Sequence, residues 1–155
     1  MLQTKTWLTE TEELARELDA PDLVIIDASW HMPSEGDAHA EYLAEHIPGA
    51  LFFDIDEIAD TKSSLPHMLP PPEKFSSRMR SMGIGDGSRI VIYDSRGLYS
   101  AARVWWTFRV MGARDVAILE GGLPKWVAEG RPTESGTATR DPRRFAAHLD
   151  PRVVH

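Results

Sequence analysis

Four short apolar runs, each followed directly by an acidic residue, constrain the fold of this chain most strongly. The runs are LVII, ALFF, IVIY and VAIL, and the residues that follow them are Asp27, Asp54, Asp94 and Glu120. Such runs are typical of strands buried on both faces of a parallel sheet. Helical segments separate them, so we predict an α/β fold with a doubly wound, mostly parallel sheet and helices on both faces. The acidic residues would then gather at the carboxyl edge, where such sheets bind ligands.

Helical periodicity and turn residues divide the rest of the chain. We expect helices over residues 9–19, 39–45, 73–82, 100–111 and 124–130. Thr9 or Thr11 is expected to cap the first helix, and Gly83 to end the third. Pro48 and Gly49 indicate a turn, and residues 60–72 form a proline-rich loop.

The composition excludes several classes of protein. The chain has 155 residues, 42% of them hydrophobic and 26% charged, as in one soluble globular domain. It contains no cysteine, which excludes thiol nucleophiles and thiolate metal sites. A net charge of −7 argues against a nucleic-acid or anionic-membrane surface. No run reaches the roughly 18 apolar residues of a membrane helix, and the charged N-terminus does not resemble a signal peptide, so we expect a cytoplasmic protein.

Two stretches of the chain resemble the rhodanese family. YLAEHIPGALFF, residues 42–53, is similar to the family signature: an aromatic residue, three residues, then His-Ile-Pro-Gly-Ala and an apolar pair. Residues 86–132 resemble the second half of the same domain. FFDID and PHMLP narrow the resemblance to the tandem sulfurtransferases of the mercaptopyruvate and thiosulfate type, which have two rhodanese domains. We therefore predict a rhodanese-like domain over residues 1–132 and a truncated interdomain linker or tail over 133–155.

A six-residue loop matches the active-site loop of the family in its length and in the glycine at its fourth position. It consists of Asp94, Ser95, Arg96, Gly97, Leu98 and Tyr99. Catalytic domains of the family begin this loop with the cysteine that accepts the sulfane sulfur. Asp94 occupies that position here, and a carboxylate cannot hold a persulfide. The resemblance therefore implies an inactive loop, with no catalytic nucleophile in this chain. We expect Asp94 to fill the loop's own anion-binding nest as an ionised structural plug.

The resemblance also implies substrate-binding roles for Asp56 and His67. In tandem sulfurtransferases the matching residues face the cleft in which the second domain's cysteine works. Asp56 would orient or protonate the donor or acceptor, and His67 would position the substrate. A purely structural interpretation stands beside this one: Asp56 caps the turn at 57–60, and His67 is an ordinary loop histidine.

Asp54-Ile55-Asp56 also fits the pattern of an aspartyl phosphotransfer site at a strand end. That chemistry needs Mg²⁺ and a lysine near a later strand end. Lys62 and Lys74 fall in a loop and a surface helix, and only Glu-Gly-Gly follows VAIL. The pattern therefore does not favour phosphotransfer.

Two further features have structural interpretations. His46 precedes Ile-Pro-Gly, so we expect it to form a local hydrogen bond that fixes the turn rather than to act as a base. Trp105 is expected on the core face of its helix, whereas Trp106 lies about 100° further round. Trp106 is then either buried on a second face or part of an interface, for which a missing partner domain is a natural candidate.

The sequence thus predicts the N-terminal domain of a sulfurtransferase. The parent reaction would move a sulfane sulfur from mercaptopyruvate or thiosulfate to a thiol or cyanide, through a cysteine persulfide in a second domain. The implied partners are a C-terminal rhodanese domain, the small-molecule donor and the acceptor, with no metal or organic cofactor. We expect the present chain alone to be inactive. The alternative is a standalone, catalytically inactive rhodanese-like module with a binding or regulatory role.

Overall fold

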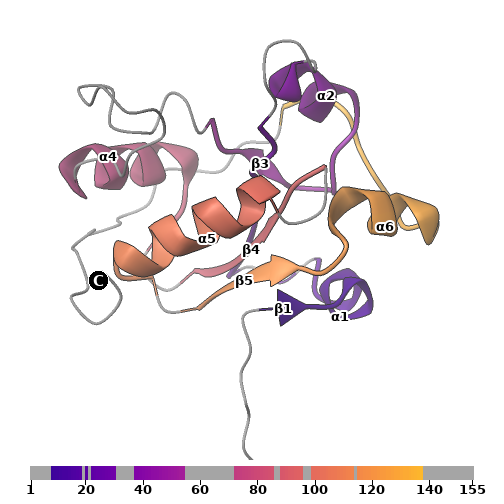
Figure 1. Ribbon diagram of the computed structural model, residues 1–155, viewed down its shortest axis with the longest axis horizontal. Coiled ribbons are helices and arrows are strands. Elements are labelled where there is room, and N and C mark those ends of the chain that lie inside the picture. Colours follow the sequence, from indigo (N-terminus) through magenta and orange to yellow (C-terminus); the bar gives the residue numbers. More distant parts are fainter. Residues whose placement is uncertain are drawn as a thin grey trace, which may run out of the picture.

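Strands and helices alternate along the chain (Figure 1). The computed structural model describes residues 8–18, 20, 22–30, 37–54, 72–85, 88–95, 99–113 and 115–137, with Tyr99 described for its backbone only. The elements are β1 (Leu8–Thr9), α1 (Thr11–Arg16), β2 (Leu23–Asp27), α2 (Ala38–Ala44), β3 (Leu51–Phe52), α4 (Pro72–Met82), β4 (Arg89–Tyr93), α5 (Tyr99–Val110), β5 (Val116–Leu119) and α6 (Gly122–Ala128).

The strands form one parallel sheet in the order β1-β5-β4-β2-β3. The central pair, β2 and β4, places Val24 opposite Ile90 and Ile26 opposite Ile92. The predicted doubly wound parallel sheet is confirmed. Strand β1 was not predicted, because a two-residue strand shows no periodicity. It pairs Leu8 with Ile118 at the edge of the sheet.

Each central strand contributes side chains to two hydrophobic clusters, one on either face of the sheet. Val24 and Ile26 belong to the cluster that includes residues of α4 and α5. Leu23 and Ile25 belong to the cluster that includes residues of α1, α2 and α6. This alternation follows from the two-residue period of a strand, and it explains why the strands are apolar without interruption. Figure 1 shows helices on both sides of the sheet.

The predicted threonine cap of α1 is wrong. The N-cap residue is Glu10, which has an extended backbone and makes no capping hydrogen bond with its side chain. Thr9 belongs to β1, and its hydroxyl donates to Glu13 Oε1 at 3.0 Å. Thr11 lies inside the helix and donates to Glu129 Oε1 at 2.6 Å, so it links α1 to the end of α6. Tertiary pairing therefore overrides the local capping preference.

Two predicted chain reversals are present as expected. Gly83 follows α4 with φ +81°, a left-handed conformation that ends helices and favours glycine. The turn at Pro48–Gly49 is closed by Ala50 N–H donating to Ile47 O at 2.9 Å, and Gly49 has φ +82°. This second turn delivers the chain from α2 into β3. Within the part of the chain that the structure describes, no helix is long and apolar enough to span a membrane.

Trp105 and Trp106 lie on a helix that is buried over a wide arc. Trp105 packs against the α4–α5 cluster and donates its indole N–H to Val116 O at 2.9 Å. Trp106 is half-buried, and Thr107 and Val110 are buried as well. The helix therefore buries more than the single face that a surface helix presents to a core.

We expect Phe108→Ala to destabilise the domain by about 3–5 kcal/mol, because it opens a cavity in the core. Phe108 is fully buried, and its ring centroid lies 5.2 Å from that of Phe75 and 5.8 Å from that of Phe53. Urea denaturation measures the change in the free energy of unfolding. As a control, Val127→Ala removes methyl groups from a residue that is 41% exposed, and it should change stability by no more than about 0.5 kcal/mol. Equal effects of the two variants would contradict this packing.

Candidate functional site

Asp94 directly follows β4 at the carboxyl edge of the sheet and is completely buried. Its Oδ2 accepts the backbone N–H of Ala101 at 2.8 Å and the hydroxyl of Ser100 at 3.2 Å. Both donors lie in the first turn of α5, where backbone N–H groups have no partner within the helix and the helix dipole is positive. The carboxylate therefore serves as the acceptor for the start of α5.

The backbone around Asp94 joins further elements at the same edge. The carbonyl of Asp94 accepts the N–H of Leu123, in the first turn of α6, at 3.1 Å. The N–H of Ser95 donates to Ser29 Oγ, just beyond β2, at 2.9 Å. One short stretch of chain thus connects β4 with α5, α6 and the end of β2.

Asp27 is the second buried carboxylate at this edge. Its Oδ1 accepts the N–H of Ser29 at 2.9 Å, and it also forms hydrogen bonds with the hydroxyls of Ser29 and Tyr93. Burial raises the pKa of Asp27 above its ordinary value, and the charge of Asp94 raises it further, whereas these hydrogen bonds oppose the shift. Burial, assisted by Asp27, likewise raises the pKa of Tyr93 well above its ordinary value. Burial therefore makes the carboxyl group of Asp27 resist ionisation.

A partly open cavity of about 300 Å³ lies beside these carboxylates. Asp27, Ser29 and Ser95 line it from the sheet edge, and Glu41, Tyr42 and Glu45 line it from α2. Every charged side chain among its described lining residues is acidic. Such a cavity disfavours anionic ligands, because the exposed carboxylates of Glu41 and Glu45 repel a like charge.

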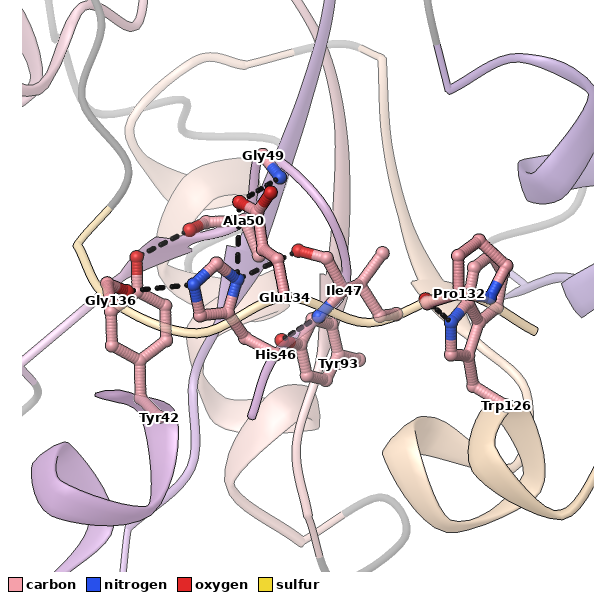
Figure 2. A network of polar contacts seen from close by, with 10 residues as sticks. All are labelled: Tyr42, His46, Ile47, Gly49, Ala50, Tyr93, Trp126, Pro132, Glu134 and Gly136. Carbon is pink, nitrogen blue, oxygen red and sulfur yellow. Dashed lines mark hydrogen bonds and ion pairs between the residues drawn. The ribbon is translucent and has the colours of Figure 1, made fainter. Parts of the chain in front are cut away.

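His46 is buried where the residues that follow α6 cross the turn between α2 and β3 (Figure 2). Its Nδ1 lies 2.9 Å from Ile47 O, which is the local contact expected from the sequence. Its Nε2 lies 2.8 Å from the carbonyl of Gly136, ninety positions along the chain. His46 and Glu134 also exchange backbone hydrogen bonds, both of 2.8 Å. The role of His46 is therefore structural. One of its ring contacts is local, and the other joins segments ninety residues apart.

The return segment, residues 132–137, is attached to the domain at several points. Trp126 Nε1 donates to Pro132 O at 2.7 Å, and the Thr133 hydroxyl donates to Glu45 Oε2 at 3.0 Å. The first residues of the predicted linker therefore contact the domain closely. The predicted boundary between residues 132 and 133 stays a prediction, as does the linker beyond residue 137, which lies outside the described residues.

The structure describes only part of the predicted site. Asp94 and Ser95 lie together at the end of β4, and the backbone of Tyr99 begins α5. Asp56, His67, Arg96, Gly97 and Leu98 lie outside the described residues, as do Lys62 and the proline-rich loop.

The sequence interpretation missed the hydroxyl groups that surround the two carboxylates. Ser29 connects Asp27 to Ser95, and Tyr93 bonds to Asp27 from the neighbouring strand. The only local signal was position, since Ser29 stands two residues after one acidic strand end and Tyr93 immediately before another. Neither spacing specifies a partner on another strand, because the contacts of Ser29 with Ser95 and of Tyr93 with Asp27 depend on the order of strands in the sheet.

The parallel sheet and the acidic edge with its buried Asp94 define an α/β domain, and its sequence contains no cysteine. A family model for the rhodanese-like domain matches residues 10–129, and the chain belongs to this family. It is 43% identical over 154 residues to human 3-mercaptopyruvate sulfurtransferase, and the match covers 95% of this chain and 52% of the human protein. It is 47% identical over 138 residues to a mitochondrial thiosulfate/3-mercaptopyruvate sulfurtransferase of Arabidopsis thaliana, covering 88% of this chain and 36% of that protein.

Solved structures agree with the sequence relatives. The crystal structure of SseA from Escherichia coli, described as a 3-mercaptopyruvate sulfotransferase with the rhodanese fold, superposes with a TM-score of 0.89 and 40% identity. The match covers 95% of this chain and 57% of SseA. The chain thus spans about half of the human protein and of SseA and about a third of the Arabidopsis protein, which is consistent with one of two tandem domains.

We expect Asp94→Ala to lower the free energy of unfolding by about 1–3 kcal/mol, because the buried donors of Ser100 and Ala101 lose their acceptor. Thermal or urea denaturation measures the loss. Asp94→Asn keeps one side-chain oxygen as an acceptor and should lose less. Unchanged stability of Asp94→Ala would show that Asp94 is not a structural plug.

Asp27→Asn tests the raised pKa of Asp27 through the pH dependence of stability. Between the ordinary carboxyl pKa of 3.8 and the raised folded value, the folded protein keeps a proton that the unfolded chain has lost. The stability of the wild type should therefore fall relative to that of Asp27→Asn as pH rises through this window. Urea titrations between about pH 4 and about pH 8 measure the difference.

Asp22→Asn is the matched control, since Arg89 lowers the pKa of Asp22 through a side-chain hydrogen bond. Its effect should have the opposite sign and appear below the ordinary carboxyl pKa of 3.8, so that the advantage of the wild type over this variant shrinks when its titrations are extended to about pH 2. A pH-independent difference between the wild type and Asp27→Asn would contradict the account of Asp27.

Proposed function

We propose that this chain is the non-catalytic N-terminal domain of a tandem sulfurtransferase. The parent reaction transfers a sulfane sulfur from mercaptopyruvate or thiosulfate to a thiol or cyanide, through a cysteine persulfide on a second rhodanese domain. The observation that carries the proposal is Asp94, which occupies the position of the nucleophile and is buried and hydrogen-bonded to the start of α5. The chain has no cysteine, and it spans about half of its sulfurtransferase relatives.

The acidic cavity supports our proposal that the sulfur donor binds outside the loop that begins at Asp94. Mercaptopyruvate and thiosulfate are anions, and the carboxylates of Glu41 and Glu45 line the cavity next to Asp27. These carboxylates would repel either donor. In our proposal the donor binds in a cleft between this domain and the second one, and this domain supplies one wall of that cleft.

Asp56 and His67 are the residues that we propose for that wall. Asp56 would orient or protonate the donor or acceptor, and His67 would position the substrate. This assignment rests on the match of FFDID and PHMLP to the tandem family. A cytoplasmic location is likewise a proposal from the sequence.

The reading frame beyond His155 distinguishes this function from that of a standalone binding module. We expect about 130 further residues, within the usual size range of one domain, that contain a second HIPGA-like motif and a loop beginning Cys-x-x-Gly. A stop codon directly after His155 would favour the binding module. Assays of the full protein with both donors then identify the preferred substrate.

In the full protein, we expect Asp56→Asn and His67→Gln each to lower kcat/KM by roughly 10- to 100-fold, because a positioned acid or a substrate contact is lost. Steady-state assays with mercaptopyruvate and thiosulfate measure the effect. Asp115→Asn and His39→Gln make the same chemical changes at exposed positions and should leave the rate unchanged. Wild-type rates for Asp56→Asn and His67→Gln would show that the two residues have structural roles only.

A further inference from the structure

Both ring nitrogens of the buried His46 face carbonyl oxygens. Nδ1 lies 2.9 Å from Ile47 O, and Nε2 lies 2.8 Å from Gly136 O (Figure 2). A carbonyl oxygen can only accept a hydrogen bond, so each contact requires a proton on the facing nitrogen. Neutral imidazole carries one N–H, whereas imidazolium carries two. Only the protonated ring satisfies both contacts at once.

One carboxylate and one aromatic ring lie close to the imidazole of His46. Glu134 Oε2 lies 3.8 Å from Nδ1, and this side chain is held in place because it also accepts the N–H of Gly49 at 2.9 Å. The ring of Tyr42, on α2, stacks on His46 with a centroid separation of 4.3 Å and an interplanar angle of 13°. No cation contacts the ring among the described residues. A buried imidazolium is thus compensated by one carboxylate and two carbonyl oxygens, as a buried charge requires.

The contacts of His46 with Glu134 and Gly136 join the domain to the return segment. Glu134 and Gly136 belong to residues 132–137, whereas His46, Ile47 and Tyr42 belong to α2 and the turn after it. We propose that His46 is protonated on both ring nitrogens when the return segment is docked, so that this docking is coupled to proton binding and weakens as pH rises. Loss of the proton leaves a nitrogen lone pair facing a carbonyl oxygen and removes the ion pair with Glu134.

This coupling gives His46 a positioning role in the proposed two-domain enzyme. The return segment directly precedes the residues that would connect to the second domain, so its attachment fixes where that connection begins. This consequence rests on the proposed function. The coupling itself does not, because it concerns contacts within the described chain.

Amide hydrogen exchange of the 155-residue chain, followed by NMR, tests the proposal. The N–H of Glu134 donates to His46 O, and that of Gly136 donates to Leu43 O, both at 2.8 Å. Between about pH 6 and about pH 8, after correction for intrinsic exchange, we expect the protection of both amides to fall about tenfold, the equivalent of one hydrogen bond. The amide of Ile90, within the sheet, is the internal reference and should keep its protection.

Three variants assign the pH dependence to His46. His46→Gln can still donate to Gly136 O and His46→Asn to Ile47 O, but neither side chain titrates, so both should lose the tenfold change. Glu134→Gln should reduce it, because the facing charge is removed. His39→Gln, an exposed histidine on the same helix, should retain it in full.

The ring nitrogens of His46 provide a measurement that needs no variant. In the wild type at about pH 6, ¹⁵N spectra should show both nitrogens protonated while Gly136 is protected. A docked segment with only one protonated ring nitrogen would overturn the proposal, and so would an undiminished pH effect in His46→Gln. Neither measurement uses turnover, so the result stands apart from that of the proposed function.

Discussion

The hydrogen bond from Ala101 to the buried carboxylate of Asp94 is the contact on which the site depends. It joins the end of β4 to the start of α5 and satisfies an N–H that the helix itself cannot pair. The neighbouring backbone groups extend this junction to α6 and to the end of β2. Asp94 and the residues beside it thus hold the carboxyl edge of the sheet together.

A second carboxylate shows the unfavourable effect of burying acidic groups at this edge of the sheet. Asp27 lies at the same buried edge, and burial together with the charge of Asp94 raises its pKa. Ser29 and Tyr93 offset part of the penalty through hydrogen bonds. The cavity next to Asp27 is lined by carboxylates and hydroxyl groups together with the apolar side chains of Ala38, Ala44 and Leu123. Both carboxylates therefore take part in the hydrogen bonding of this buried sheet edge.

The sequence predicted those parts of the fold that depend on local pattern. Uninterrupted apolar runs predicted the longer strands, because residues such as Val24 and Leu23 face opposite helical layers. Strand β1 was not predicted, and the predicted threonine cap of α1 was wrong. Pairing with β5 places Thr9 in a strand, and this tertiary contact overrides its local preference for capping a helix. The contact between His46 and Gly136 was also out of reach, because a separation of ninety residues leaves no periodic signal. The sequence shows an aspartate at position 94, whereas its hydrogen-bond partners could be identified only from the structure.

Sulfur transfer by the purified 155-residue chain tests the central claim most directly, namely that Asp94 replaces the nucleophile and supplies only structure. The chain is incubated with thiosulfate or mercaptopyruvate and with cyanide, and thiocyanate formation is measured against a buffer blank. The account predicts a rate equal to the blank with both donors, because a carboxylate cannot hold a persulfide. Turnover above the blank that disappears in Asp94→Asn would contradict it.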